Sequence, residues 1–200
     1  IKNSGADLLI TVDCGITSFK EIEFAKSIGL DVIITDHHDI QSDKIPNAYS
    51  IINPKRTDNA FTFNALAGVG VAFMLILNLY EKLKTKEEAY VYLDLVAIGT
   101  IADIVPLVKE NRIFAKHGLE KLLYSENKGL RFLITKLFET AKLEFTTYDV
   151  GFVIAPVFNA AGRLKDAKMV VKLLTSDNDR EIEVISKELI NKNFERRELQ

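Results

Sequence analysis

An aspartate followed by two histidines, Asp36-His37-His38, is the part of this sequence best suited to chemistry. Imidazole nitrogens bind metals and carry protons, and carboxylates supply hard oxygen ligands. The triplet follows Val32-Ile33-Ile34-Thr35, a β-branched and mostly apolar run that predicts a core strand. Ligands of open parallel α/β sheets bind just beyond the carboxyl ends of the strands. We therefore expect the triplet to lie where such proteins bind metals and substrates.

A second acidic residue, Asp13, is expected beside this triplet. Residues 7–12 predict a first strand that ends at Asp13, and a helix with a capping box at Ser18 and Glu21 follows. A strand, a helix and a second strand at residues 31–35 predict two parallel strands joined by a right-handed crossover. Asp13 would then share one sheet edge with the triplet. The alternatives are a helix-capping role for Asp13 and a solvated loop for the histidines.

A third acidic candidate, Asp103, lies in the apolar run of residues 97–107. A lone charge among apolar residues is costly unless it is paired or bound to a cation. Asp103 is therefore a candidate metal ligand. The alternative is an aspartate that caps a helix terminus or pairs with Arg112.

Two runs of small residues are candidates for phosphate binding. Residues 159–163, from Asn159 to Arg163, predict a turn whose arginine suits bidentate phosphate binding. Residues 67–71 contain two glycines before an apolar helix, but they lack the complete dinucleotide or P-loop pattern. For that second run close helix packing is the favoured interpretation. Cys14 is expected to be a small buried residue.

The remaining elements predict an α/β fold with a parallel, Rossmann-like sheet followed by a mostly helical region. A short third strand is expected, and a charged helix from residue 177 carries Ile182, Ile185 and Leu189 at helical spacing. That charge content favours a solvated connecting helix. The expected strand covers residues 49–52, and the expected helices cover residues 69–83, 87–101, 112–123, 130–141, 148–155 and 167–174.

The composition is that of an ordinary globular protein, with 48% hydrophobic and 27% charged residues. A net charge of −2 provides no global basic field for nucleic acid, although a local basic groove is compatible with it. The single cysteine excludes an internal disulfide and fits a reducing compartment. No run is apolar enough to span a bilayer and no signal peptide is evident. The sequence thus predicts a cytoplasmic protein without a membrane partner.

Several runs together resemble the DHH phosphoesterase superfamily, and within it the single-stranded-DNA-specific 5′→3′ exonucleases. They span most of the chain, and those at residues 52–56, 66–73 and 159–164 are typical of the exonucleases in particular. The runs are Thr11–Gly15, Ile34–His38, Ile52–Arg56, Leu66–Phe73, Gly99–Asp103 and Asn159–Leu164.

The resemblance implies a two-metal phosphodiesterase that uses Mn²⁺ or Mg²⁺. Asp13 would bridge the metals, with His37 and Asp103 as further ligands. His38 would lie near the scissile phosphate or the attacking water, and Asp36 would orient the site from behind. Arg163, together with Asn159, would hold substrate phosphate. Two metals ~4 Å apart can lower the pKa of a bound water to about 7 and stabilise both the attacking and the leaving oxygen.

The implied activity is that of a metal-dependent 5′→3′ exonuclease core acting on single-stranded DNA in repair and recombination. Its implied partners are single-stranded DNA, a single-strand-binding protein and a helicase. One alternative is a DHH phosphodiesterase for short oligonucleotides or cyclic dinucleotides, and degradation of long single strands would distinguish the two. Another is a DHH-like scaffold that binds a partner without hydrolysis.

The resemblance also predicts the domain organisation. Residues 1–176 would be an N-terminally truncated DHH domain, and residues 177–200 would begin the helix that leads to a missing DHHA1 domain. The upstream Asp-x-Asp run of the family is not in this chain. We therefore expect an incomplete two-metal site, and a chain that is weak or inactive by itself.

Overall fold

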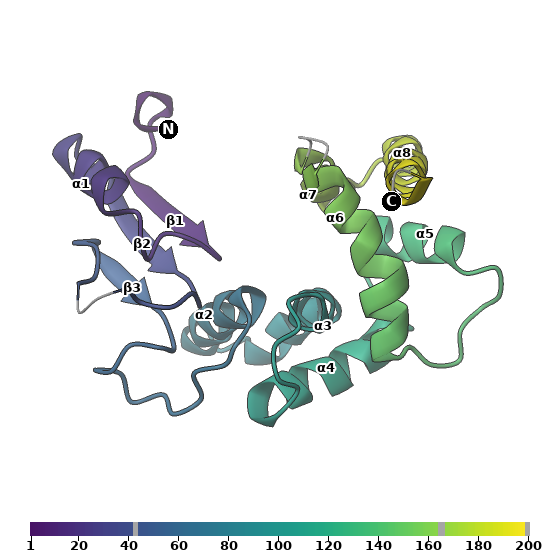
Figure 1. Ribbon diagram of the computed structural model, residues 1–200, viewed down its shortest axis with the longest axis horizontal. Coiled ribbons are helices and arrows are strands. Elements are labelled where there is room, and N and C mark those ends of the chain that lie inside the picture. Colours follow the sequence, from purple (N-terminus) through teal and green to yellow (C-terminus); the bar gives the residue numbers. More distant parts are fainter. Residues whose placement is uncertain (42–43, 164–166, 199–200) are drawn as a thin grey trace. The chain divides into compact units, whose positions relative to one another are not determined.

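The computed structural model describes residues 1–41, 44–163 and 167–198, without the side chains of residues 162 and 163. The chain forms two compact units. Ile1–Tyr90 and Asp103–Phe114 make up the first unit, and Val91–Ala102 and Ala115–Gln200 make up the second. The strands belong to the first unit, and the described part of the second is helical (Figure 1).

The first unit contains a parallel three-stranded sheet in the order β1 (Leu8–Val12), β2 (Asp31–Thr35) and β3 (Ser50–Ile52). Val12 pairs with Thr35, which pairs in turn with Ile52, so the three strands end level. Figure 1 shows their arrowheads side by side. The predicted parallel sheet is confirmed, and with it the common edge at which the residues after β1 and β2 leave the sheet.

Helix α1 (Phe19–Ser27) covers one face of this sheet. Its apolar residues pack with those of the strands in a buried cluster that comprises Ile22, Ala25, Leu30, Val32 and Ile34. The predicted capping box at Ser18 is wrong, since the Ser18 side chain makes no capping hydrogen bond. Ser18 has ψ of 55°, outside the extended region that an N-cap side chain needs to reach back to the helix.

Helix α2 (Gly68–Lys82) agrees with the predicted helix at residues 69–83. The single α-helix expected over residues 87–101 is wrong in its first half, which is a 3-10 helix at Lys86–Tyr92 that leads into α3 (Leu93–Ala102). In the first turn of α3, buried Asp94 accepts hydrogen bonds from Leu95 N at 2.7 Å and Ser125 Oγ at 2.6 Å. Helix α4 (Lys109–Leu122) follows.

The second unit is built from helices around one apolar core. After α3 and the rest of α4 come α5 (Lys128–Leu137), the π-helix η3 (Asp149–Ile154), α6 (Ala155–Arg163), α7 (Lys168–Thr175) and α8 (Asp179–Glu198). The core residues are Leu133, Val157, Ala161, Met169, Leu173, Ile182, Ile185 and Leu189. In the described part of the chain, no helix combines the length and apolarity needed to cross a membrane.

Two predictions about this second unit are wrong. Helix α8 is not a solvated connector, because Ile182, Ile185 and Leu189 are buried in the core while its charges face outward. Residues 159–163 are not a turn but the end of α6. Ala160 and Ala161 are fully buried, and their small side chains allow α6 to pack closely against its neighbours.

Thr146 and Asp149 form a reciprocal capping box around the helical turn that leads into the π-helix η3. Asp149 N donates to Thr146 Oγ1 at 3.3 Å, and Asp149 Oδ2 accepts from Thr146 N at 2.8 Å. Lys142 Nζ donates to Asp149 Oδ1 at 2.8 Å. Burial alone would raise the pKa of Asp149, but these bonds to Lys142 and Thr146 outweigh it and hold the pKa below its ordinary value.

We expect Asp149→Asn to destabilise the protein in a pH-dependent way. A depressed pKa means that the carboxylate stabilises the fold above its unfolded pKa, and that this stabilisation is lost as the pH falls through the folded pKa. Urea unfolding at neutral pH should show a loss of about 1 kcal/mol, typical of a lost cap, and the loss should shrink toward about pH 3. Asp177→Asn, which breaks an exposed pair with Lys128, is the control. An equal loss for Asp149→Asn at both pH values would contradict this account.

Candidate metal centre

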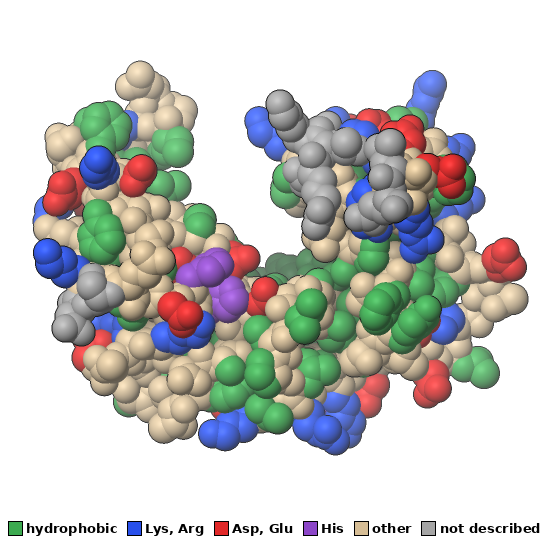
Figure 2. Space-filling view, viewed as in Figure 1, with side chains coloured by type: hydrophobic (Ala, Val, Ile, Leu, Met, Phe, Trp, Pro, Cys, Tyr) green, Lys and Arg blue, Asp and Glu red, His purple; other side chains and the backbone are tan. Residues whose placement is uncertain are grey.

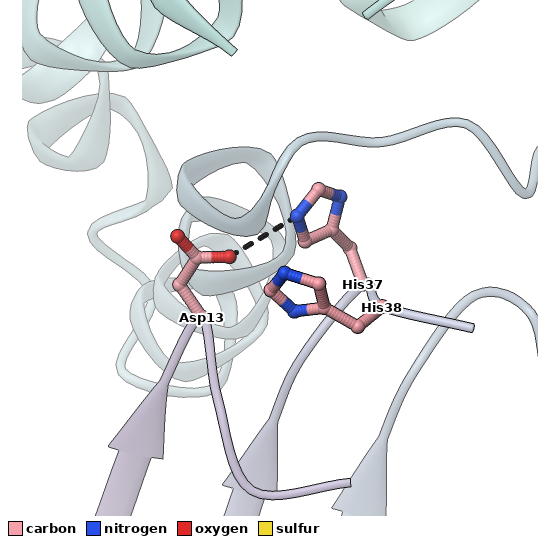
Figure 3. A group of neighbouring side chains, drawn as sticks. All are labelled: Asp13, His37 and His38. Atoms are coloured by element: carbon pink, nitrogen blue, oxygen red, sulfur yellow. Dashed lines mark ion pairs between the residues drawn. The ribbon is translucent and has the colours of Figure 1, made fainter. Parts of the chain in front are cut away.

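Asp13 leaves β1 in an unusual backbone conformation. Its φ of 62° lies in the left-handed region that non-glycine residues rarely adopt. Asp13 N donates to Thr35 O at 2.9 Å, which continues the β1–β2 pairing for one more residue. Such strain, of order 1–3 kcal/mol, persists only where the surrounding structure enforces it, and it is frequent at functional sites. The turn directs the Asp13 carboxylate toward His37 (Figure 3).

The ring of His37 has a defined orientation. His37 Nδ1 lies 3.0 Å from the carbonyl oxygen of Leu66, and a carbonyl can only accept, so Nδ1 carries the proton. In the neutral ring the lone pair is then on Nε2. Nε2 lies 3.1 Å from Asp13 Oδ1 and 3.6 Å from Asp103 Oδ2. The ring is mostly buried, with 13% of the side chain exposed, so this orientation is held by its surroundings.

Asp103 directly follows α3, and its carboxylate lies beside the His37 ring. The apolar residues around Asp103 in the sequence do not bury it, since 39% of its side chain is exposed. Its ion pair in the structure is with His37, not with the alternative partner Arg112. Partial burial raises the pKa of Asp103; the charge of His37 opposes this rise and that of Asp13 adds to it. The next residue, Ile104, has φ of 59°, a strained value for a β-branched residue.

Asp36 lies behind the site and holds His38. It is 1% exposed and accepts hydrogen bonds from the backbone N–H groups of Ile16, His37 and His38. Burial would raise the pKa of Asp36, but these bonds and one from the His38 ring hold it below its ordinary value. His38 Nδ1 lies 2.7 Å from Asp36 Oδ1, and this bond raises the pKa of His38. Nε2 of His38 is thereby directed away from Asp36, and 60% of the side chain is exposed.

These residues form a donor set that fits a divalent cation. One donor atom from each of Asp13, His37 and His38 lies within 4.8 Å of the others, and Asp103 adds a second carboxylate beside His37. Without a cation, a proton on Nε2 lets His37 pair with the two carboxylates; with Nε2 deprotonated, its lone pair and the carboxylate oxygens would together form a donor set for a cation. Mixed imidazole and carboxylate ligands suit Mn²⁺, and the carboxylates also suit Mg²⁺. Figure 2 shows histidine side chains at the surface beside acidic ones.

The two predicted substrate-binding residues belong to α6 in the second unit. Asn159 is exposed on α6 in the second unit, and the side chain of Arg163 lies outside the described residues. The structure thus brings Asp13, Asp36, His37, His38 and Asp103 together, while the assignment of metal and substrate roles to these residues stays a prediction.

Sequence reasoning missed the neighbour of Asp13. A Cβ on Gly68 would overlap the Asp13 carboxylate and lie 2.7 Å from Asp13 Cβ, so only glycine fits there. Close helix packing, the interpretation favoured for the glycine run, does not account for either glycine: a Cβ on Gly70 would make only ordinary contacts, and a Cβ on Gly68 would meet Asp13. The prediction of a buried Cys14 is wrong, since this residue is exposed in the turn after Asp13.

Residues 1–100 match the model of the DHH family, N-terminal domain. The chain therefore belongs to the DHH family. It is 44% identical over 199 residues to the single-stranded-DNA-specific exonuclease RecJ of Bacillus subtilis (strain 168) and 40% identical over 207 residues to that of Escherichia coli (strain K12). These matches cover 100% and 98% of this chain, but only 24% and 36% of the relatives.

Solved structures agree with this relationship. The crystal structure of RecJ from Thermus thermophilus in complex with Mn²⁺ matches with a TM-score of 0.86 and 37% identity, over 98% of this chain and 29% of that one. A crystal structure of exonuclease RecJ bound to manganese has the same TM-score at 36% identity and covers 98% of this chain and 49% of that one. The predicted α/β fold and its resemblance to this family are thereby confirmed.

We expect Gly68→Ala to weaken metal binding, because the added Cβ displaces the Asp13 carboxylate. The Mn²⁺ dissociation constant, measured by calorimetry, should rise about tenfold or more. Gly70→Ala is the matched control in the same helix, since its Cβ would meet Leu66 Cδ2 at an ordinary 3.4 Å. That variant should bind Mn²⁺ like the wild type, and equal affinities for both variants would contradict the placement of Asp13.

We expect Asp36→Asn to lower the pKa of His38, because the charged acceptor of its Nδ1–H is lost. A nuclear magnetic resonance titration in the presence of a chelator should show His38 moving from its raised value toward about 6.5. Asp39→Asn is the control, since Asp39 pairs with Lys55 and has no hydrogen bond to His38 in the described structure. A His38 titration that is unchanged by Asp36→Asn would show that this bond does not govern the ring.

Proposed function

We propose that the protein is a divalent-metal-dependent phosphodiesterase in which Asp13, His37 and Asp103 are metal ligands. The orientation of His37 is the observation that carries this proposal. The Leu66 carbonyl oxygen accepts a hydrogen bond from Nδ1–H, and Nε2 faces two carboxylates at 3.1 and 3.6 Å. Metal-binding histidines commonly donate their second ring N–H to a carbonyl or carboxylate in this way. Mn²⁺ or Mg²⁺ is the proposed cofactor.

The other residues of the site act on substrate and proton. Bound metal ions would supply an activated water and stabilise charge on the phosphate. Asp36 holds His38 through Nδ1 and leaves Nε2 accessible. Because the pKa of His38 is raised, the ring stays protonated to higher pH than an ordinary histidine. Its Nε2–H can then donate to a phosphate oxygen or to the departing oxygen. His38 is accordingly the proposed catalytic residue, and Asp36 is the residue that positions it.

The proposed substrate is single-stranded DNA, hydrolysed from the 5′ end. Relatives named single-stranded-DNA-specific exonuclease match essentially the whole of this chain at 36–44% identity, which supports this choice over short oligonucleotides or cyclic dinucleotides. Arg163 and Asn159 are the proposed phosphate-binding residues, within a proposed DHH domain of residues 1–176 against which α8 packs. A cytoplasmic role in DNA repair and recombination, with a single-strand-binding protein and a helicase as partners, completes the proposal.

We expect His37→Ala and Asp103→Ala to abolish Mn²⁺-dependent nuclease activity in the full-length protein while leaving its circular dichroism unchanged. The loss should exceed about 100-fold, because each substitution removes a proposed metal ligand. His117→Ala is the matched control, since His117 is an exposed histidine on α4 that pairs with Glu120. It should retain full activity.

The substrates used in the assay separate the alternatives. Degradation of a long 5′-labelled single strand supports the exonuclease, and hydrolysis restricted to dinucleotides or cyclic dinucleotides contradicts it. Wild-type rates in His37→Ala or Asp103→Ala would remove these residues from the metal site, and no activity on any phosphodiester in the wild type would favour a scaffold without hydrolysis.

A further inference from the structure

Asn111, in the first turn of α4, joins two loops of the first unit through its side-chain amide. The residue is fully buried. Its Nδ2 donates to the carbonyl oxygen of Ala65 at 2.6 Å and to that of Pro106 at 3.0 Å. Both partners are carbonyl oxygens that can only accept, so the orientation of the amide is unambiguous.

Each of these two carbonyls adjoins a residue of the candidate metal centre. Ala65 precedes Leu66, whose carbonyl accepts the hydrogen bond from His37 Nδ1. Pro106 lies in the loop that begins at Asp103 and contains the strained Ile104. Asn111 therefore connects the support of His37 to the loop that carries Asp103, although these segments are far apart in the sequence.

Placing the Asn111 amide in this buried position lowers the free energy of unfolding. Asn111 Oδ1 is buried and has no hydrogen-bond partner among the residues that the structure describes. A buried unsatisfied acceptor typically costs about 1–3 kcal/mol. Ile104 has a left-handed backbone conformation, which is stable only if other contacts hold its loop in place. The hydrogen bond to Pro106 O, shared with Val108 N at 2.9 Å, is such a point.

We propose that Asn111 is a positioning residue for the metal centre. By tying the two loops together it maintains the 3.6 Å separation of His37 Nε2 and Asp103 Oδ2, and with it the affinity for the cation. The inference rests on the proposed function, which supplies the divalent metal. Asn111 touches neither metal nor substrate, and it acts through the carbonyl of Leu66 and the loop after Asp103.

The test replaces Asn111 by leucine, which has a similar shape but no donors, and measures Mn²⁺ binding by calorimetry in the full-length protein. Partners behind metal ligands change affinity by about 10–100-fold, and Asn111 acts one bond further away. We therefore expect the Mn²⁺ dissociation constant of Asn111→Leu to rise about tenfold. In the nuclease assay the variant should need more Mn²⁺ for half-maximal rate but regain most of the wild-type rate at saturation.

Asn127→Leu is the matched control, because Asn127 makes the same kind of bridge in the second unit. Its Oδ1 accepts from Leu130 N at 2.9 Å and its Nδ2 donates to Leu174 O at 2.8 Å. The control should lower the unfolding temperature of the metal-free protein but leave the Mn²⁺ dissociation constant within about twofold of wild type. A purely structural role for Asn111 would give the same pattern as this control.

Asn111→Ser is a milder variant that keeps one donor and leaves the helix start intact. It should raise the Mn²⁺ dissociation constant by less than the leucine variant does, and it carries the test if Asn111→Leu does not fold. Wild-type Mn²⁺ affinity in a folded Asn111 variant overturns the positioning role and leaves the proposed function standing. Failure of the wild type to bind Mn²⁺ overturns the proposed function itself, and with it this inference.

Discussion

The hydrogen bond from His37 Nδ1 to the Leu66 carbonyl is the interaction on which the candidate site depends. It fixes the ring, places the Nε2 lone pair of the neutral form toward Asp13 and Asp103, and so creates a site with an excess of electron-rich atoms. A solvated histidine would rotate freely and offer no such preorganisation. The remaining architecture of the first unit brings the acceptor and the two carboxylates to this ring.

Backbone strain accompanies both carboxylates. Asp13 itself, and Ile104 directly after Asp103, have positive φ values. These conformations are costly. The hydrogen bond from Asp13 N to Thr35 O and the close approach of Gly68 constrain Asp13, and the proposed role of Asn111 is to constrain the loop of Ile104 through Pro106 O. The protein thus uses the stability of its sheet and helices to hold acidic side chains close to one another, where they repel unless a cation is bound.

The sequence was a good guide to the sheet and to the residues that gather at its edge. Short apolar runs and the strand–helix–strand order sufficed to place Asp13 beside the Asp36-His37-His38 triplet, because parallel strands end at the same edge of the sheet. The burial of Ile182, Ile185 and Leu189 in α8 was not predicted. The high charge content of this helix indicated exposure, although its apolar residues form one buried face. The helical end of α6 was mistaken for a turn for a related reason, since small residues serve both structures.

What sequence reasoning could not supply was the support of the site. Leu66 acts through its backbone carbonyl, which every residue possesses, so no side-chain pattern marks it. Gly68 and Asn111 contact segments that are remote from them in the sequence, namely Asp13 and Ala65. Such contacts depend on how loops fold back onto the sheet, and they are visible only in three dimensions.

Electron spin echo spectroscopy of Mn²⁺ bound to the full-length protein tests the central claim most directly, because it detects nitrogen coordinated to the metal. The account predicts a coupling from a directly bound imidazole nitrogen that disappears in His37→Ala and persists in His38→Ala. Absence of nitrogen coupling in the wild type, or its persistence in His37→Ala, would contradict the assignment of His37 as a metal ligand.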